Sequence, residues 1–441
     1  MKKQVVKEIQ ALLGNQSIVI PESMAGYLKG NEAPLALVFP ENTSDVVKII
    51  KIADKCAVKV AVGGNTVVTK GLKDGIAISM ARMSRIIEID HENLVATVEP
   101  GVNHKEFQEK LAAEGLYFPP EPFKGLTSSI GGCFASGTLD SRSFNYGPTR
   151  TYILGFEMVL PNGEVLNVGS KTIKNVAGYD MIHFVVGSRG TLGIITKVLI
   201  KLLPLPAAQN TVLGSFLNYT EACKCIRTLF SRRIYTARLN LLNSAMAHEI
   251  TSGIFTETPK YLVMADIEGF KPSTKHLSQE IASIFKLGGA SDIMVAEDPE
   301  QNDAIWSNWL ALKEKLNSDS SISTIDIMVG QSKLNEALKG LEAIVGNLNL
   351  CTSLIVHAPN GNILLVPSES SLSDIDETLR KINELAMGLG GSISGSPGQR
   401  LRCQSNNENE MWEDMAGIIT SIREQFDPKG TLIPGESLIG I

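Results

Sequence analysis

Three glycine-rich segments are the parts of this 441-residue chain whose residue types fit cofactor binding. Residues 60–66 run from an apolar strand into Gly63-Gly64-Asn65-Thr66, and residues 127–137 mix hydroxyls with small side chains. Residues 187–196 place three glycines before another apolar strand. Two glycines at a strand end allow a sharp turn and leave successive N–H groups facing an anion such as a pyrophosphate. Each segment alone is a weak signal, but the three together predict a cofactor site.

Two common nucleotide-binding motifs are absent. A dinucleotide fingerprint requires a strand, Gly-x-Gly-x-x-Gly, a helix and an acidic residue about 20 positions later. Gly187, Gly190 and Gly193 are spaced Gly-x-x-Gly-x-x-Gly instead, and they lead into a strand. The Gly-Lys-Ser or Gly-Lys-Thr of a phosphate-binding loop occurs nowhere in the chain. The predicted cofactor site therefore follows neither pattern.

The elements that must position these segments alternate between strands and helices up to about Pro206. We expect a helix capped by Thr43 or Ser44 and a second one at 104–114. Pro161-Asn162-Gly163 predicts a hairpin turn between two of the strands. The predicted strands are 35–39, 58–62, 76–79, 86–89, 94–98, 153–160, 165–168 and 194–203.

A second pattern covers residues 207–394. Predicted strands at 212–216, 235–240 and 261–267 alternate with longer helical patterns at 221–230 and 274–285. Trp306 and Trp309, three residues apart, predict one helix face that packs into the core. Such a series favours an antiparallel sheet covered by helices, which makes the fold class α+β. A last helix is predicted at 410–426.

Composition excludes several classes of protein. With a net charge of −6 and no cluster of Lys and Arg, the chain does not resemble a nucleic-acid-binding protein. Its first residues predict an amphipathic helix rather than a targeting signal, and no apolar run approaches the ~20 residues of a membrane span. The six cysteines are scattered without metal-site spacing, so we expect thiols in a reducing cytoplasm.

At this point the chain resembles a known family. Its motifs follow, in order, those of the FAD-binding domain of vanillyl-alcohol-oxidase or p-cresol-methylhydroxylase (PCMH) type, and more narrowly those of the flavin subunits of glycolate oxidase and D-lactate dehydrogenase. The matching strings are Pro34–Pro40, Gly63–Thr66, Val98–Val102, Ser129–Gly132, Tyr146-Gly147, Lys174–Asp180, Gly187–Gly193 and the ending Phe426–Gly435.

The resemblance implies a two-domain FAD protein. The chain would form an FAD-binding domain at 1–206, leave for a cap domain at 207–404 and return at 405–441. In the family, the turn that corresponds to Gly63–Thr66 (the first turn) and the Ser129–Gly137 segment bind the FAD pyrophosphate. The Gly190–Ile194 stretch contacts the adenine side, and Pro100-Gly101 lies near the flavin. Members with covalent FAD often use a His in the first turn; Asn65 and Thr66 stand there, so we expect non-covalent FAD. The implied cofactor-binding residues are Gly63, Gly64, Asn65, Thr66, Pro100, Gly101, Thr127, Ser129, Gly131, Gly132, Ser136, Gly190, Gly193 and Ile194.

The cap departs from the family pattern. Family members carry His-x-Gly-Asp-Gly-Asn-Leu-His and later Gly-Glu-His-Gly, whose histidines bind a divalent metal and supply the base. This chain keeps His357 but has Leu364 at the second histidine, and residues 395–398 read Gly-Ser-Pro-Gly. One imidazole without a carboxylate does not make the metal site, so we expect no metal. His357 is either a remaining base or an ordinary histidine at a strand end, and Arg400 and Arg402 either clamp a substrate carboxylate or lie at the surface.

Two functions follow from the resemblance. In the first, FAD takes a hydride from a 2-hydroxy acid such as glycolate or D-lactate, with His357 and Arg400 as the candidate catalytic residues. The chain has no iron–sulfur ligand set, so electrons would leave through a partner, an iron–sulfur or electron-transfer-flavoprotein subunit. In the second, the chain is a non-catalytic FAD-holding electron-transfer subunit of a glycolate-oxidase-like complex, which the lost cap histidines favour.

Overall fold

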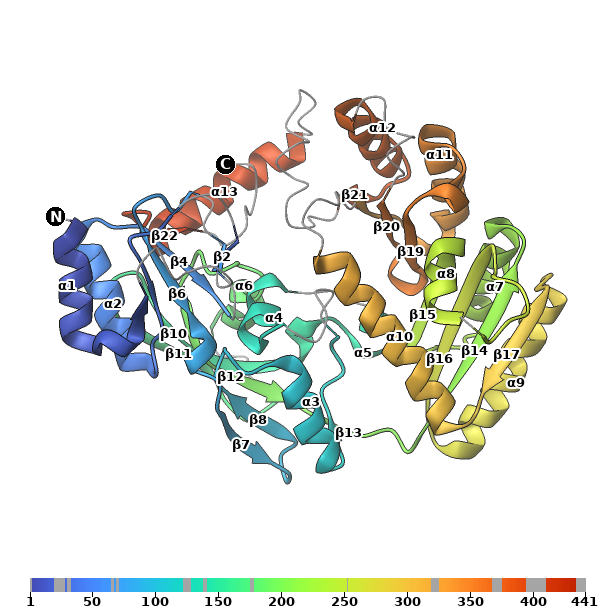
Figure 1. The fold of residues 1–441 in the computed structure, drawn as a ribbon, viewed down its shortest axis with the longest axis horizontal. Helices are drawn as coiled ribbons and strands as arrows, with labels where there is room; N and C mark the ends of the chain where they lie inside the picture. The colour runs from blue at the N-terminus through green and yellow to red at the C-terminus, as the bar shows by residue number, and fades with distance from the viewer. Residues whose placement is uncertain are drawn as a thin grey trace.

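The chain folds into two parts joined near residues 203–208 and seen side by side in Figure 1. The structure, a computed structural model, describes residues 2–19, 28–29, 33–64, 67–68, 71–121, 128–137, 141–174, 178–251, 253–318, 325–366, 375–393 and 410–433. The first part contains both ends of the described chain, because α13 (Glu410–Phe426) and β22 (Leu432–Ile433) return to it.

The first sheet of this part is mostly parallel, in the order β1-β3-β6-β4-β22. Its strands are β1 (Ile18–Val19), β3 (Ala36–Val38), β6 (Ile76–Ser79), β4 (Val60–Gly63) and the returning β22. Helices α1 (Lys2–Leu13) and α2 (Thr43–Cys56) pack with it. The N-cap of α2 is Asn42 and not Thr43 or Ser44, because the Asn42 side chain accepts a hydrogen bond from the Asp45 N–H.

The second sheet is antiparallel, in the order β11-β10-β12-β8-β7. The predicted hairpin is confirmed, since β10 and β11 pair in register on either side of residues 160–164. The strands are β7 (Ile86–Asp90), β8 (Val95–Val98), β10 (Ile153–Val159), β11 (Val165–Gly169) and β12 (Ile194–Lys201). The helices of this region are α3 (His104–Ala113), α4 (Ile130–Ser136), α5 (Ser143–Tyr146) and α6 (Met181–Val185). Two-stranded pairs join β9 (Leu116–Tyr117) to β13 (Leu203–Pro204) and β2 (Leu28–Lys29) to β5 (Val67–Val68).

The second part, the cap, is built on an eight-stranded sheet in which every pairing is antiparallel. In sheet order the strands are β17 (Asp292–Ala296), β14 (Ala208–Phe216), β16 (Tyr261–Gly269), β15 (Arg238–Asn243), β19 (Ser353–His357), β20 (Asn362–Val366), β18 (Ile325–Met328) and β21 (Ser392–Ile393). The two-domain α+β fold of PCMH type is therefore confirmed, and the cap is the predicted antiparallel sheet covered by helices. We keep the domain boundaries at residues 206 and 404 as a proposal, supported by the parallel pairing of β22 with β4.

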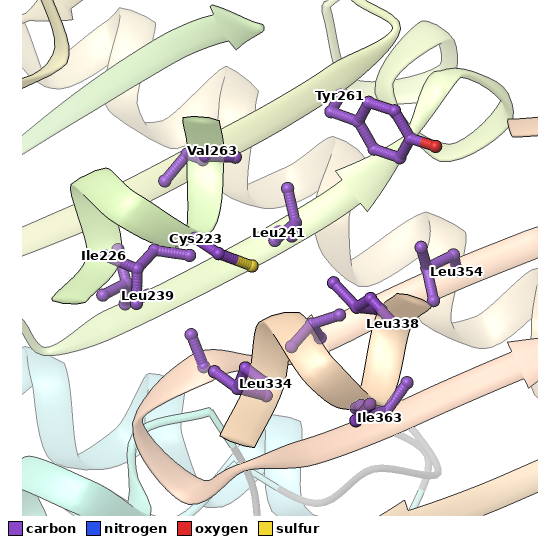
Figure 2. Close-up of a cluster of buried hydrophobic side chains, with 14 of the residues drawn as sticks. Cys223, Ile226, Leu239, Leu241, Tyr261, Val263, Leu334, Leu338, Leu354 and Ile363 are labelled. Carbon is purple, nitrogen blue, oxygen red and sulfur yellow. The ribbon is translucent and has the colours of Figure 1, made fainter. Parts of the chain in front are cut away.

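The two faces of the cap sheet differ in what they bury. On the outer face, Leu239, Leu241 and Val263 pack with residues of α7 such as Ile226 (Figure 2). The helices of this face are α7 (Tyr219–Ser231), α9 (Lys271–Leu287), α11 (Leu334–Val345) and α12 (Ile375–Gly388). The inner face carries α8 (Ser244–Thr251) and α10 (Pro299–Ser318), and α10 lies on the side turned toward the first part (Figure 1).

Strand alternation explains this division. Successive side chains of a strand point to opposite faces. In β15, Leu239 and Leu241 therefore join the outer core, whereas Arg238 and Asn240 face the opposite way with Leu242. The tryptophan prediction is confirmed, because Trp306 and Trp309 of α10 are buried in the inner cluster.

Candidate functional site

The first two glycine-rich segments meet at the N-terminal end of α4. Gly64 follows β4, and a Cβ built on it would lie 2.0 Å from Oγ of Ser129. That same hydroxyl accepts a hydrogen bond from the Gly132 N–H at 3.1 Å, so Ser129 caps α4. Two stretches more than sixty residues apart in the chain thus approach with no room for a side chain.

The described part of the second glycine-rich segment, residues 128–137, is largely helical. Ser129 supplies the N-cap and Gly137, with φ of 60°, ends α4 in the left-handed conformation. The small residues between them fit a short helix against neighbouring backbone. The sequence did not predict this helix, because a glycine pair disfavours a helix by propensity, and here capping at both ends and packing against other elements stabilise it.

Pro100 and Gly101 lie against the same helix. A Cβ on Gly131 would come 2.5 Å from the Pro100 Cβ, and one on Gly101 would come 2.0 Å from the carbonyl oxygen of Met80. The Gly131 N–H donates to the Pro100 carbonyl at 2.8 Å, which fixes this approach. Residues of four separate segments thus pack backbone to backbone around the start of α4.

The third glycine-rich segment lies at the other end of α4. Gly187 and Arg189 donate their N–H groups to the carbonyls of Phe134 and Ala135, at 3.1 and 2.8 Å. Gly193 packs against β10, where a Cβ would lie 3.0 Å from the carbonyl of Val159, and Ile194 begins β12. Helix α4 therefore joins all three segments. Asn65, Thr66, Thr127 and Arg400 lie outside the described residues.

The inner face of the cap holds a buried network of charges that the sequence did not single out. Arg238 of β15 donates from Nε to Glu121 at 3.0 Å and from a terminal nitrogen to Asp266 of β16 at 2.7 Å. Nζ of Lys313 on α10 lies 3.4 Å from the other oxygen of Glu121. All four side chains are at most 10% exposed. Glu121 comes from the first part of the chain, so this network joins the two parts.

A second buried pair also crosses between the parts. Arg142, just before α5, donates to both carboxylate oxygens of Glu268 at 2.5 and 2.6 Å, and the hydroxyl of Tyr146 donates to the same carboxylate. The Arg142 guanidinium lies over the Tyr117 ring, 4.9 Å from its centroid. The Tyr117 hydroxyl has no hydrogen-bond partner in the described structure.

The charges set the protonation of this network. Burial would raise the pKa of the Glu121 carboxyl, but Lys313, Arg238 and Arg142 outweigh it and hold this pKa far below its ordinary value. Burial raises the pKa of Asp266 to about 6, helped by the neighbouring Glu268 and opposed by Arg238. In Glu268 the cations prevail over burial, so its pKa is lowered. Asp266 is therefore the carboxyl of this network that titrates nearest to neutral pH.

His357 ends β19 on the inner face and is 4% exposed. Its Nδ1 lies 2.8 Å from Oδ1 of Asn240, and its ring is 6.1 Å from that of Trp309. Burial and the charge of Lys313 lower the pKa of His357 to about 3, against the opposing effect of Glu121. His357 is thus a neutral imidazole at physiological pH.

The family's metal site has no counterpart among the described residues. Leu364 of β20 is buried in the inner cluster beside Ile355 of β19. No group of three His, Cys, Asp or Glu side chains in the described ranges is placed to hold a metal ion. In the same ranges, no helix has the length and apolar character needed to cross a membrane.

Comparisons with known proteins agree with this architecture. The family of FAD-binding domains matches residues 34–169, and the C-terminal domain of FAD-linked oxidases matches residues 205–437. The chain is 30% identical to the D-lactate dehydrogenase of Archaeoglobus fulgidus over 411 residues, covering 91% of this chain and 90% of that protein. It is 28% identical over 420 residues to "Glycolate oxidase subunit GlcD" of Bacillus subtilis, with coverages of 91% and 88%.

Two solved structures are similar in fold. One is 4-ethylphenol oxidase from Gulosibacter chungangensis, with a TM-score of 0.75, 15% identity and coverages of 98% and 96%. The other is p-cresol methylhydroxylase, with a TM-score of 0.73, 17% identity and coverages of 99% and 96%. At these identities the likeness concerns the fold alone.

Proposed function

The chain belongs to the family of FAD-linked oxidases, and from this premise we propose that it oxidises a small 2-hydroxy acid and delivers the electrons to a separate protein. The chain is an FAD-dependent oxidoreductase. FAD supplies the redox chemistry by accepting the hydride, while the protein binds, orients and shields the reactants.

The glycine-rich segments around α4 fit a cofactor that lies against the protein backbone. A side chain at Gly64, Gly101 or Gly131 would collide with neighbouring atoms at 2.0 to 2.5 Å, so these segments come together only as glycines. The N–H groups of Ile130, Gly131 and Gly132 already bond to Val102, Pro100 and Ser129. These three N–H groups are therefore not free to bind the pyrophosphate of FAD. With no His in the first turn, the proposed attachment is non-covalent.

The observation that carries the proposal is the charged inner face of the cap. Removing ions from water costs several kcal/mol each, and their mutual attraction often no more than repays this, so replacing a buried ion network by apolar residues is often neutral or stabilising. Arg238, Asp266 and Lys313 are nevertheless buried on this face, together with the polar Asn240 and His357. A polar substrate is the kind of ligand for which such a face is suited.

Two residues have proposed roles in the reaction. His357 is neutral, so its imidazole can accept the proton of the substrate hydroxyl as the hydride leaves. Arg400 would bind the substrate carboxylate through a bidentate pair, which matches the geometry of a guanidinium.

Electrons leave through a partner in this proposal. The five cysteines that the structure describes are scattered, and no group of three His, Cys, Asp or Glu side chains in the described ranges is placed to hold a metal ion. A relative carries the name of a glycolate oxidase subunit, and an iron–sulfur or electron-transfer-flavoprotein subunit is the proposed acceptor here.

A second candidate is an FAD-holding electron-transfer subunit that oxidises no substrate itself. Leu364 stands at the second family histidine, and a general base works best with a pKa near the operating pH, whereas the pKa of His357 is about 3. Both observations favour this candidate over catalysis by the cap.

Anaerobic absorbance spectra distinguish the two candidates. The purified flavoprotein is mixed with glycolate, D-lactate and other 2-hydroxy acids, and dithionite is added afterwards. Bleaching of the flavin bands by a hydroxy acid supports the dehydrogenase. Bands that every hydroxy acid leaves oxidised, but that dithionite bleaches, overturn it in favour of the electron-transfer subunit.

A further inference from the structure

One buried histidine of the first part is hydrogen-bonded to two peptide groups that lie close together in the sequence. His104 is the first residue of α3 and is 1% exposed. Its imidazole Nε2 lies 2.8 Å from the Pro120 carbonyl oxygen, and its main-chain N–H donates to the Ser128 carbonyl at 2.9 Å. A carbonyl oxygen only accepts hydrogen bonds, so Nε2 carries the proton. His104 therefore bonds the peptide groups that precede Glu121 and Ser129.

Each of these two peptide groups leads into a site described above. Glu121 carries the carboxylate that the cap cations Arg238 and Lys313 approach to 3.0 and 3.4 Å. Ser129 caps α4, and its hydroxyl fills the space in which a Cβ on Gly64 would stand. One histidine thus joins the charged inner face of the cap to the glycine-rich surface proposed for FAD.

Main-chain hydrogen bonds fix His104 against the start of α4. Residues 100–104 lie antiparallel to residues 128–131, and the two stretches are joined by main-chain bonds of 2.8 to 2.9 Å. The Asn103 side chain caps α3 and so fixes the direction in which this helix begins. A displacement of the peptide group at Glu121 is therefore passed to the start of α4, because His104 has little freedom to absorb it.

The choice of histidine at this position is explained by its bond to Pro120. The imidazole lies beside Phe118, with the ring centroids 5.8 Å apart, and its Nδ1 is buried without a hydrogen-bond partner in the described structure. A buried polar atom without a partner is destabilising, and a phenylalanine would avoid that cost but lose the bond. Burial lowers the pKa of His104 to about 4, so the ring is neutral at physiological pH and Nε2 remains the donor.

We propose that His104 is a positioning residue that couples the charged cap network to the FAD-binding surface. The cap cations hold Glu121, and His104 passes this constraint to Ser129 at the start of α4. The coupling is reciprocal, because a network that strengthens FAD binding is itself strengthened by bound FAD to the same extent. This inference rests on FAD binding and holds for either candidate function.

A double-mutant cycle on FAD affinity tests the coupling. Apoprotein is titrated with FAD, and flavin fluorescence gives the dissociation constant for the wild type, Glu121→Gln, His104→Leu and the double variant. We expect Glu121→Gln to weaken FAD binding about fivefold or more on its own, and less than about twofold in the presence of His104→Leu. His104→Gln keeps a side-chain N–H donor and should retain the full response to Glu121→Gln.

Glu268→Gln is the matched control for this cycle. Glu268 also carries a buried carboxylate that pairs with a cation of the other part, Arg142, but His104 makes no bond to this pair in the described structure. The effect of Glu268→Gln on FAD affinity should therefore be the same with and without His104→Leu. Additive effects of Glu121→Gln and His104→Leu overturn the coupling. An equal dependence of both glutamates on His104 also overturns it, since His104 would then only seat the cap as a whole.

Hydrogen exchange tests the reverse direction and requires no variant of His104. Mass spectrometry compares the apoprotein with the FAD-saturated protein in peptides that cover Arg238 of β15 and Lys313 of α10, for the wild type and Glu121→Gln. We expect FAD to slow exchange in these peptides of the wild type and to slow it far less in Glu121→Gln. Equal slowing in the two proteins, or none in either, overturns the coupling.

These outcomes are separate from those of the proposed function. A protein that binds no FAD overturns the coupling and the proposed oxidation together. Hydroxy acids that leave the bound flavin oxidised overturn only the oxidation, because the affinity and exchange measurements use oxidised FAD without substrate.

Discussion

The two sides of the proposed site are built by different means. On the FAD-binding side, glycines 64, 101 and 131 let backbone segments approach one another, and few side chains take part. On the cap side, the surface is formed by buried ionic and polar side chains. They come from strands β15, β16 and β19, from helix α10, and from Glu121 and Arg142 of the other part. We therefore expect the FAD-binding side to be sensitive to added side-chain atoms, and the cap side to be sensitive to the removal of a charge.

The difference follows from what each side has to do. A backbone surface recognises a ligand by shape more than by side-chain chemistry. A side-chain surface can change its chemistry one residue at a time, as the replacement at Leu364 illustrates. We propose that cofactor binding and substrate choice are encoded separately in this chain, the first in short contiguous motifs and the second in residues dispersed along the sequence.

The largest expected effect is on the backbone side. Gly101→Ala places a Cβ 2.0 Å from the carbonyl oxygen of Met80 and 2.7 Å from that of Met83, and neither main-chain atom can rotate away. We expect a loss of bound FAD of about tenfold or more, with a destabilisation of about 3 kcal/mol. The ratio of flavin to protein absorbance after purification measures the first, and denaturant unfolding the second.

Gly388→Ala is the control for that variant. Gly388 has nothing within 4 Å of a built Cβ, so its FAD content should equal that of the wild type. If Gly101→Ala retains FAD as well as Gly388→Ala does, the close backbone approach around α4 is not what forms the cofactor surface.

The same contrast explains how far the sequence alone could go. The glycine strings were found because each is contiguous, and β10, β11 and the helical tryptophan face follow directly from local periodicity. The helix within 127–137 was missed because its stability comes from capping by Ser129 and from packing, not from propensity. The functional roles of individual FAD contacts stay predictions.

The cap network was missed for another reason. Its charges belong to segments far apart in the sequence, so no contiguous motif predicts them. Lys313 and Glu121, for example, are 192 positions apart. A signal was nevertheless present. Arg238 stands next to Leu239 at the start of a strand, and Asp266 stands between Ala265 and Ile267. A charge at an inward position of an apolar strand indicates a buried partner elsewhere in the chain.

The next largest effect is expected from Glu121→Gln on the cap side. The substitution keeps the shape but removes the negative charge that Arg238 and Lys313 share, and it leaves them incompletely compensated in a buried position. We expect the free energy of unfolding to fall by about 3 kcal/mol. Glu88→Gln removes a carboxylate from a pair with Lys171 in which both side chains are more than a third exposed, and it should cost less than about 1 kcal/mol. Equal decreases in the free energy of unfolding in the two variants would show that burial does not increase the contribution of the cap network to stability.

A smaller effect concerns Asp266 and pH. The folded-state pKa of Asp266 is raised to about 6 from 3.8, so between these values the folded protein binds a proton that the unfolded chain has lost. Stability from this group is therefore present below pH 4 and decreases as the pH rises to 6. Compared with Asp266→Asn, the wild type should lose about 2 kcal/mol between pH 4 and pH 6. Urea unfolding of both proteins across this range measures the difference; parallel pH curves would mean that Asp266 stays ionised in the fold.

The smallest expected effect concerns the pH dependence of the rate of flavin reduction. If His357 accepts the substrate proton, the rate of flavin reduction should be independent of its ionisation from pH 5 to pH 8, because its pKa is lowered to about 3 by burial and by Lys313. An ordinary histidine, with a pKa near 6.5, would make the rate fall about tenfold per unit below pH 6. Lys313→Gln removes the cation that helps to lower the pKa and should move a limb upward toward the measured range. Stopped-flow reduction at each pH, with Lys315→Gln as the control for an exposed lysine of the same helix, decides the matter. If the rate in the wild type instead falls below about pH 6.5, His357 has the pKa of a hydrated imidazole. The inner face of the cap would then be exposed to water, whereas His357 is buried in the structure.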